Sequence, residues 1–570
     1  MKLTTLTAAL TLVCTGCYDG VRDLDGQAEG GGDGADAGDG ADAGDAGDAG
    51  DDGAEPPAAA DEVPIAGLRR LSAAEYDATI RDILLDEATN ATLLLPVDPR
   101  TPFDNDYTDH IPSEALIEAA ELLATDAADR LVDDPARLSM LLPCTPASPT
   151  DEACLQQFAE QWGRRAIRRP PTPEEVQLWL HGENGAGGAV EIAGELGDFA
   201  WGVHTIVRTL LQDPEFLYRV EIGTPVSGDP TLHRLNDFEI ATRLSYFLWG
   251  SAPDDWMLDR AEQGTLDTPE DVRDVAAMML DDDRALDRID RFHAMWFGYE
   301  SMPFGGQTMI DMKAETKALV ERVIFERDLP WQDLFRSTET YVTADLATHY
   351  GLPAPANAAG DWVAYGDSGR QGLLSHGTFL SIGGKFGDTS PVQRGLAIRT
   401  RLFCQVIPPP PPGVDADQEP ADAICKQDRY AVHSEGGCAG CHMQIDPVGF
   451  GLEAYGPTGQ FRAFEEDDPE TPDDESQCAI SGDGELAGVG AFNGPAELSD
   501  LALSERYVDA CVQEQLVRFL NGRYELDEID EAYIAAAAEP LGDGDFTFRA
   551  LLLELVGSEA FGYRRDEAAQ

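Results

Sequence analysis

The five residues "CAGCH", residues 438–442, place two thiols and an imidazole at a spacing that supports specific chemistry. Two residues between Cys438 and Cys441, followed directly by His442, form the pattern of c-type haem attachment: both thiols bond the haem and the histidine binds its iron. A zinc site needs a second ligand pair at short range, which His433 and Cys425 do not form in the sequence. A redox dithiol usually follows a strand of a βαβ unit, and none is evident here. The motif predicts one covalent haem c, with a dithiol, a disulfide or a metal site as alternatives.

The N-terminus predicts export, which covalent haem attachment requires. Lys2 is followed by an apolar run over residues 3–13, too short for a membrane span and typical of a secretory signal. The pair Gly16-Cys17 resembles the lipobox of bacterial lipoproteins, although Cys14 stands where that pattern usually has leucine. We therefore expect lipidation of Cys17 and a location at the outer membrane or cell surface, facing the periplasm or exterior. Plain secretion is the alternative.

Composition predicts an acidic protein that is held away from the membrane by a tether. Residues 18–62 consist mainly of Gly, Ala and Asp and cannot bury enough apolar surface to fold, so they predict a disordered tether. The chain has 106 acidic and 40 basic residues and a formal net charge of -66. This charge disfavours nucleic acid and anionic lipid as partners and favours a cationic partner or divalent ions. The lipid anchor is thus the only expected membrane contact.

Helices dominate the pattern of the remaining chain. Capping residues followed by apolar positions at helical spacing mark four helix starts, at Ser72 with Glu75, Thr172 with Pro173, Asn236 with Glu239, and Thr268 with Pro269. Strand patterns are sparse, and the best is residues 478–494, whose Gly-Asp and Asn-Gly turns predict a small hairpin. Residues 408–412, "PPPPP", predict a polyproline II spacer rather than a recruitment motif.

The six cysteines outside the leader and the motif predict disulfides. An even number in an exported chain is typical of disulfide pairing, and the sequence alone allows 15 pairings. Cys144 and Cys154 flank the loop-like "CTPASPTDEAC", so this local bridge is the one pairing we predict; the others are Cys404, Cys425, Cys478 and Cys511.

A series of sequence blocks extends from residue 65 to the C-terminus: "LRRLSAAEYDATIRDIL", "CLQQFAEQWGRRAIRRPPTPEE", "LLQDPEFLYRVE" with "RLSYFLWGSAPDDWMLDRAEQGTL", "GLLSHGTFLS" with "TSPVQRG" and "PPPPP", "CAGCHMQIDPVGFGLEAYGPTGQFR", and "LVRFLNGR" with "FTFRALLLELVGSEAF". In this order they resemble the modules of large exported proteins of the Planctomycete-cytochrome type. The resemblance implies several domains of unknown function around one haem-c motif, with a suggested association with polysaccharide breakdown. Of the family's residues, it assigns a role only to Cys438, Cys441 and His442.

The expected fold is mainly α: a multidomain helical body with a cytochrome-c-like haem segment and a small C-terminal β-hairpin. We predict a signal peptide (residues 1–17), the tether (18–62), three helical domains (63–143, 144–228 and 229–365), a cytochrome-c-like domain (366–465) and a C-terminal hairpin plus helical domain (466–570).

The sixth iron ligand is not determined by the sequence, because no methionine follows Met443, which itself adjoins the proximal histidine. His376 is the candidate we name, since its segment lies in the same predicted domain; the others are His349, His433, Met309 and Met312. Arg394 and Arg399 are candidates to pair with haem propionates, with solvated helix-face charges as the favoured alternative. Residues 103–110, "FDNDYTDH", offer three aspartates for calcium but lack the glycine and glutamate of an EF-hand loop.

These observations predict a membrane-tethered monohaem c-type cytochrome-like protein that acts in extracytoplasmic electron transfer or haem-linked oxidoreduction. A redox partner protein is expected, and a glycan is a further candidate partner. Two protein ligands would make an electron carrier, whereas an open sixth site would allow peroxide or small-ligand chemistry. The alternative is a surface scaffold or glycan-binding lipoprotein in which the haem is structural. No catalytic triad, phosphate loop or other enzymatic constellation stands out, so the sequence assigns no catalytic residue.

Overall fold

The structure, a computed structural model, describes residues 57–567 apart from residues 89, 101, 385–387, 409–422 and 467–473. The predicted signal peptide with Cys17, residues 18–56 of the predicted tether, and prolines 409–412 of the predicted spacer lie outside the described residues. In the part of the chain that the structure describes, every helix is too short or too polar to cross a membrane.

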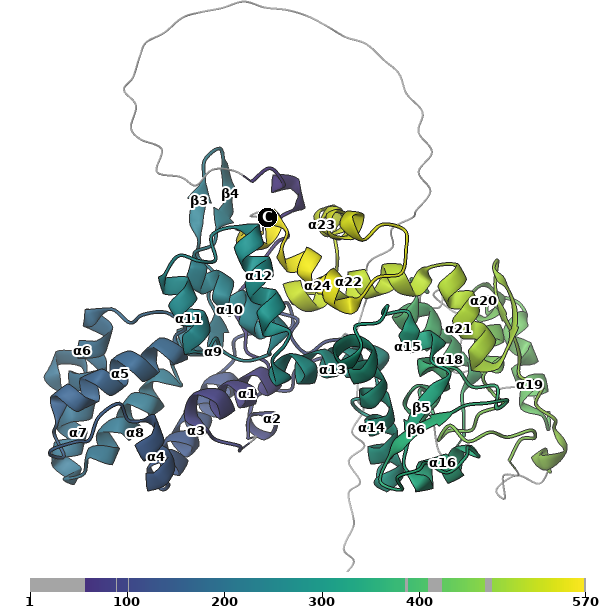
Figure 1. Ribbon diagram of the computed structural model, residues 1–570, viewed down its shortest axis with the longest axis horizontal. Helices are drawn as coiled ribbons and strands as arrows, with labels where there is room; N and C mark the ends of the chain where they lie inside the picture. The colour runs from purple at the N-terminus through teal and green to yellow at the C-terminus, as the bar shows by residue number, and fades with distance from the viewer. Residues whose placement is uncertain are drawn as a thin grey trace, which may run out of the picture.

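The predicted mainly α, multidomain fold is confirmed (Figure 1). The first group of helices, here the N-terminal lobe, lies at one end of the molecule, and its buried core includes Leu155, Phe158, Val203 and Leu210. Its helices are α1 (Ala73–Leu84), α2 (Ala91–Leu94), α3 (Glu114–Val132), α4 (Pro135–Leu141), α5 (Glu152–Ala166), α6 (Pro173–His181), α7 (Ala189–Leu196), α8 (Phe199–Leu210) and α9 (Pro214–Leu217).

The middle of the molecule is built from segments far apart in the sequence. Helices after the N-terminal lobe pack with those near the C-terminus, so that Trp296, Phe548 and Phe561 belong to one buried cluster. These central helices are α10 (Asp237–Leu248), α11 (Asp255–Glu262), α12 (Pro269–Met279), α13 (Asp283–Phe297), α22 (Tyr507–Asn521), α23 (Glu528–Ala538) and α24 (Phe548–Val556).

The opposite end, here the motif lobe, carries the "CAGCH" residues. Val448 of its helix α20 belongs to the same buried cluster as Trp296, so this lobe shares a continuous core with the central helices. The helices of the motif lobe are α14 (Gln307–Glu321), α15 (Asp333–Arg336), α16 (Ala344–Tyr350), α17 (Gly377–Leu380), α18 (Pro391–Ala397), α19 (Lys426–Arg429), α20 (Ala439–Phe450) and α21 (Gly494–Ser504).

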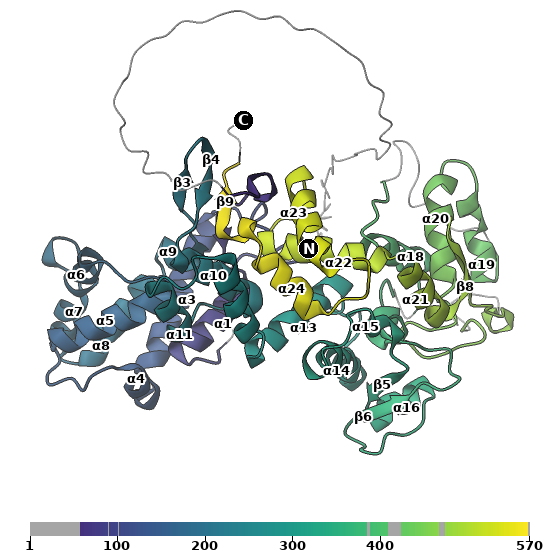
Figure 2. The same cartoon turned by 45° about the horizontal axis from the view of Figure 1, so that its top comes forward.

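The strands form small antiparallel sheets. The predicted hairpin is confirmed as β7 (Asp483–Leu486) and β8 (Gly490–Asn493). The other described sheets were not predicted, because their strands are short and two of the pairings span long sequence separations. They are β1 (Arg69–Arg70) with β2 (Tyr218–Arg219), β3 (Thr224–Val226) with β4 (Asp229–Arg234), β4 with β9 (Tyr563–Arg565), and β5 (Glu339–Val342) with β6 (Asp361–Ala364). Figure 2 shows β9 beside the β3–β4 hairpin, which joins the end of the chain to its middle.

The predicted helix starts are confirmed by their capping bonds. Ser72, Thr172 and Asn236 each accept from the backbone three residues on, and the glutamate there bonds back to the cap. Thr268 caps α12, which begins at Pro269. Reciprocal caps satisfy two orphan backbone donors at once, so these local signals define helix starts without tertiary help.

Disulfides join the six remaining cysteines, and the predicted Cys144–Cys154 bridge is confirmed. The other two bridges were not derivable from the sequence. Cys404–Cys511 ties the motif lobe to α22, and Cys425–Cys478 ties the segment before α20 to the segment before β7.

Candidate functional site

Cys438 and Cys441 are the free cysteines of the described residues. Cys438 is the residue directly before α20, and Cys441 and His442 lie in its first turn, where the His442 amide donates to the Cys438 carbonyl at 3.1 Å. Both thiols and the imidazole are therefore carried by a single helical turn, as the sequence predicts for c-type haem attachment.

Close packing against α18 positions α20. A β-carbon on Gly395 of α18 would collide with the carbonyl of Ile445, and one on Gly449 would collide with the carbonyl of Pro391. Only glycine permits such a close backbone approach at these two points. The backbones of the two helices are therefore in direct contact at these points. The first turn of α20, which carries Cys441 and His442, lies at the opposite end of the helix from Gly449.

The imidazole of His442 is oriented by a carboxylate one helical turn later. His442 Nδ1 lies 2.9 Å from Asp446 Oδ1, and His433 Nδ1 lies 2.8 Å from Asp446 Oδ2. The ring centroids of His433 and His442 are 4.0 Å apart. With Nδ1 engaged by Asp446, the Nε2 atom of His442 is the ring nitrogen left for a ligand.

Sequence reasoning missed the role of Asp446. The signal that predicts it is the four-residue spacing from His442, which puts both side chains on the same helix face. His433 precedes the helix and reaches Asp446 through the fold of its loop, so its part in the cluster was not derivable from spacing. His433, His442 and Asp446 are the group of potential metal ligands found among the described residues.

The surroundings of the motif fit a haem. A β-carbon on Gly440 would meet no atom within 4 Å, so the turn between the thiols is open on that side. Met443, next to His442, is 61% exposed, and Val406 is 82% exposed two residues before Pro408, whose carbonyl lies 3.8 Å from Cys441 Sγ. Buried Arg399 donates to the Gln444 carbonyl of α20, and its Nη2 atom has no hydrogen-bond partner. These features match the chemistry of a haem with propionates: two free thiols, an available imidazole nitrogen, exposed apolar surface and an unpaired cationic donor.

Arg394 has a structural role instead. Its guanidinium pairs with Glu453 at 3.0 Å and donates to three backbone carbonyls, those of Leu380, Leu452 and Gly456. The prediction of solvated helix-face charges was wrong for both arginines, since Arg394 is 2% and Arg399 5% exposed. Sequence periodicity could not reveal this, because the partners come from elsewhere in the chain: α20 supplies the carbonyl beside Arg399, and the segment after α20 supplies carbonyls beside Arg394.

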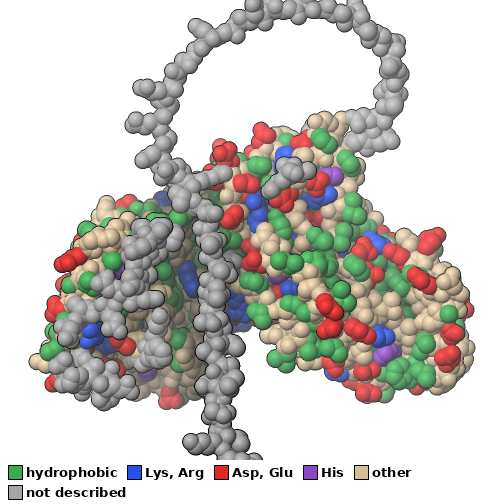
Figure 3. Space-filling view, turned by 180° about the vertical axis from the view of Figure 1, so that it is seen from behind, with side chains coloured by type: hydrophobic (Ala, Val, Ile, Leu, Met, Phe, Trp, Pro, Cys, Tyr) green, Lys and Arg blue, Asp and Glu red, His purple; other side chains and the backbone are tan. Residues whose placement is uncertain are grey.

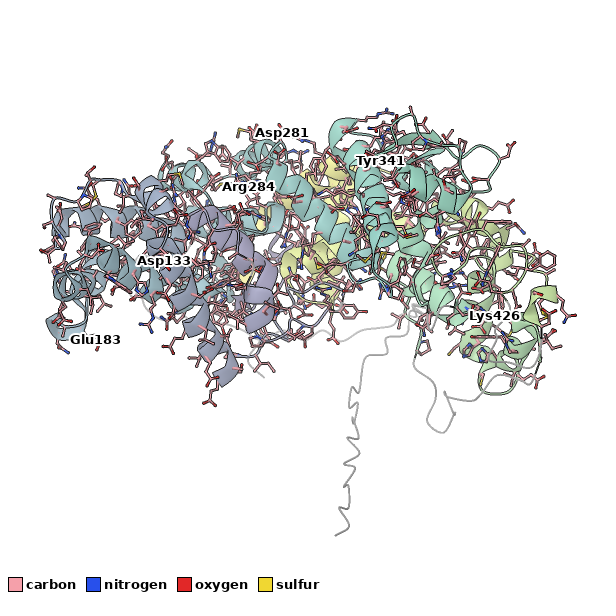
Figure 4. The ribbon with its side chains drawn as sticks, turned by 90° about the horizontal axis from the view of Figure 1, so that it is seen from below. Asp133, Glu183, Asp281, Arg284, Tyr341 and Lys426 are labelled. Atoms are coloured by element: carbon pink, nitrogen blue, oxygen red, sulfur yellow. A yellow bond between two sulfur atoms is a disulfide. The ribbon has the colours of Figure 1, made fainter. Side chains whose placement is uncertain are left out.

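Glu453 is the centre of a buried ion cluster beside α20. Its carboxylate contacts Arg394, Lys426 at 3.2 Å and Arg462 at 3.0 Å, and it accepts from the Thr389 hydroxyl at 2.5 Å. Figure 4 labels Lys426 among the helices of this lobe. Three cations from separate segments thus converge on one carboxylate and hold α18, α19 and the segment after α20 together.

His376, the predicted candidate for the sixth iron ligand, lies fully buried next to α14. Its Nδ1 is 3.0 Å from the Thr316 hydroxyl and its Nε2 is 3.8 Å from Glu315. Burial, together with the charge of Arg370, lowers the pKa of His376 to about 3, so the ring is neutral. Its neighbours Thr316 and Glu315 lie on α14 rather than on α20, and its role as an iron ligand stays a prediction.

The aspartates of residues 103–110 have partners that replace a calcium ion. Asp104 accepts two bonds from Arg291, at 2.5 and 3.2 Å. Asp106 accepts from Thr108 and from the Tyr524 amide. Asp109 is exposed. Asp104 and Asp106 therefore connect this segment to distant parts of the chain.

Asp104→Asn is expected to lower the free energy of unfolding by about 2 kcal/mol near neutral pH. Burial of Asp104 raises its pKa, but Arg291 outweighs this and lowers it from 3.8 to about 2. A carboxyl group whose pKa is lower in the folded than in the unfolded protein stabilises the fold at pH values above its unfolded-state pKa. This stabilisation is lost as the pH falls through the folded-state pKa. The difference between parent and variant should therefore shrink between about pH 4 and pH 2. Urea unfolding at neutral and acid pH tests this, with exposed Asp109→Asn as the control; a pH-independent difference contradicts it.

Family models match four successive parts of the chain. They are PSD3, a protein of unknown function (DUF1587), at residues 69–133; PSD5 (DUF1595) at 154–221; PSD4 (DUF1592) at 235–352; and PSCyt3 (DUF1588) at 370–465. The last match contains α18, α20 and the "CAGCH" residues, and its name is of the cytochrome type. No curated protein and no solved structure matches the chain.

Proposed function

Because the chain belongs to the multidomain Planctomycete-cytochrome-type family, we propose that it is a monohaem c-type cytochrome that transfers electrons outside the cytoplasm. The observation that carries this proposal is the pair of free thiols, Cys438 and Cys441, presented with His442 on one turn of α20. The six other described cysteines are all paired. Two unpaired thiols in a chain whose other described cysteines form disulfides support covalent attachment of a haem at these thiols.

The residues of this site have distinct tasks. Cys438 and Cys441 would form the thioether bonds, and His442 would bind iron through Nε2 while Asp446 holds Nδ1. Arg399 would offer its unpaired Nη2 to a propionate. The bound haem supplies one-electron oxidation and reduction. The polypeptide supplies attachment, ligand orientation and the local charge.

Export and anchoring are part of the proposal. Disulfides form and persist in oxidising compartments, so the three bridges support a location outside the cytoplasm. The proposed anchor is a lipid on Cys17, followed by the acidic tether predicted for residues 18–62. The last part of that segment belongs to the folded body, because residues 60–62 form a short 3-10 helix and the Ala60 carbonyl accepts from Arg565. The helical body would then lie away from the membrane surface, where a soluble redox partner can reach it.

A redox titration of the exported chain tests the electron-transfer function. The protein is produced in a host with haem-maturation enzymes, and its visible spectrum is recorded with dithionite and with ferricyanide. Electron transfer requires reversible conversion between reduced and oxidised c-type spectra. A covalent haem whose spectrum stays unchanged under both reagents contradicts electron transfer and supports the structural-haem scaffold instead. A colourless protein contradicts the cytochrome function altogether.

The net charge of -66 predicts how electron-transfer rates respond to salt. Figure 3 shows acidic side chains over several parts of one face. Reduction of the haem by a cationic complex, such as hexaammineruthenium(II), should slow by roughly tenfold or more as salt rises, because the attraction is screened. Oxidation by anionic ferricyanide should become faster under the same conditions. Stopped-flow absorbance measures both, and equal salt responses for the two reagents contradict steering by the acidic surface.

A further inference from the structure

The carboxylate of Asp446 is shared between two histidines. Oδ1 lies 2.9 Å from His442 Nδ1 and Oδ2 lies 2.8 Å from His433 Nδ1. The Asp446 side chain is 9% exposed, so its charge is poorly hydrated and its interactions with the two rings are correspondingly strong. Each oxygen thus accepts one N–H from one imidazole.

His433 is held in this position by its own neighbours. The ring of Tyr430 packs edge-on against His433 with centroids 5.0 Å apart, and Tyr430 also packs edge-on against Phe450 of α20. His433 lies alongside His442 at 4.0 Å between centroids. This side-by-side arrangement makes His433 a partner of the carboxylate rather than a ligand facing His442 across an iron atom.

A carboxylate that accepts the Nδ1–H of an iron-ligating histidine increases the electron donation of the other ring nitrogen. Such second partners fix the ring orientation and raise ligand basicity, which favours the more highly charged oxidation state of the metal. A second N–H on the same carboxylate withdraws part of that electron density. His433 is therefore expected to weaken the Asp446–His442 bond.

Resting on the proposed haem function, we propose that Asp446 is a positioning residue that presents His442 Nε2 to the iron and lowers the haem reduction potential, and that His433 limits this effect by sharing the carboxylate. The two side chains thus act on the potential in opposite directions. This sign difference separates the inference from a purely structural role, in which both losses would loosen the site in the same way.

The test compares haem content and midpoint potential in three variants of the full chain. Asp446→Asn should keep covalent haem and shift the potential upward, because the amide accepts more weakly than a carboxylate. His433→Phe should shift it downward, since a phenyl ring retains the packing on Tyr430 but donates no N–H. Glu435→Gln removes an exposed carboxylate close in sequence that is outside the cluster, and should leave the potential nearly unchanged.

The outcomes distinguish this inference from the function on which it rests. A parent without covalent haem overturns both. A haem-bearing parent whose potential is unmoved by Asp446→Asn, or moves equally with Glu435→Gln, overturns the inference alone. If Asp446→Asn fails to fold, the downward shift in His433→Phe still decides. A change from a low-spin to a high-spin spectrum in His433→Phe would make His433 an iron ligand and overturn its assigned role.

Discussion

Replacing Cys438 and Cys441 together by alanine is expected to abolish covalent haem attachment. Without the two thiols no thioether bond can form, so the c-type spectrum that survives acid extraction in the parent should disappear in the variant. His442 and Asp446 remain in place, which means that any residual colour must come from non-covalent haem. Pyridine haemochrome spectra before and after acid–acetone extraction measure the loss.

The matched control removes two other cysteines. Cys144→Ala/Cys154→Ala eliminates the short bridge in the N-terminal lobe, which has no residue of the motif in its core, and should retain covalent haem at the level of the parent. Acid-stable haem in the Cys438→Ala/Cys441→Ala variant would contradict attachment at the motif. Loss of haem in both variants would instead indicate a general failure of folding or export.

Glu453→Gln is expected to destabilise the packing around α20 by about 3–5 kcal/mol. The carboxylate is almost fully buried and compensates Arg394, Lys426 and Arg462 at once. A glutamine amide has the same shape but no negative charge, so the three cations stay buried without their counter-ion. Removing one partner of a buried ion cluster in this way is strongly destabilising. Native-state hydrogen exchange of α18 and α20 measures the change in their local opening free energy.

Glu485→Gln serves as the control for this change, because Glu485 is an exposed residue of β7 in the same lobe. It should alter amide protection by less than about 0.5 kcal/mol, as is usual for surface substitutions. Protection of α20 that is equal in Glu453→Gln and Glu485→Gln would show that the ion cluster does not support the helix.

Features that depend on neighbouring residues could be predicted from the sequence. They include the β7–β8 hairpin, the Cys144–Cys154 bridge and the helix caps at Ser72, Thr172, Asn236 and Thr268. In each case the interacting atoms lie within about ten residues, so residue type and spacing specify the geometry. The spacing of Cys438, Cys441 and His442 is of the same local kind.

Contacts between distant segments follow from the packing of the folded chain. These contacts join residues whose separation in the sequence shows no periodic pattern. Examples are the Cys404–Cys511 and Cys425–Cys478 bridges and the pairing of β4 with β9. The burial of Arg394 and Arg399 likewise depends on segments distant in the sequence. The same is true of His433, which reaches Asp446 from a separate loop. Spacing along the chain identifies the imidazole that can bind iron and, four residues later, the carboxylate beside it. The second imidazole, His433, is brought to that carboxylate by packing of a separate segment, which leaves no signal in the spacing.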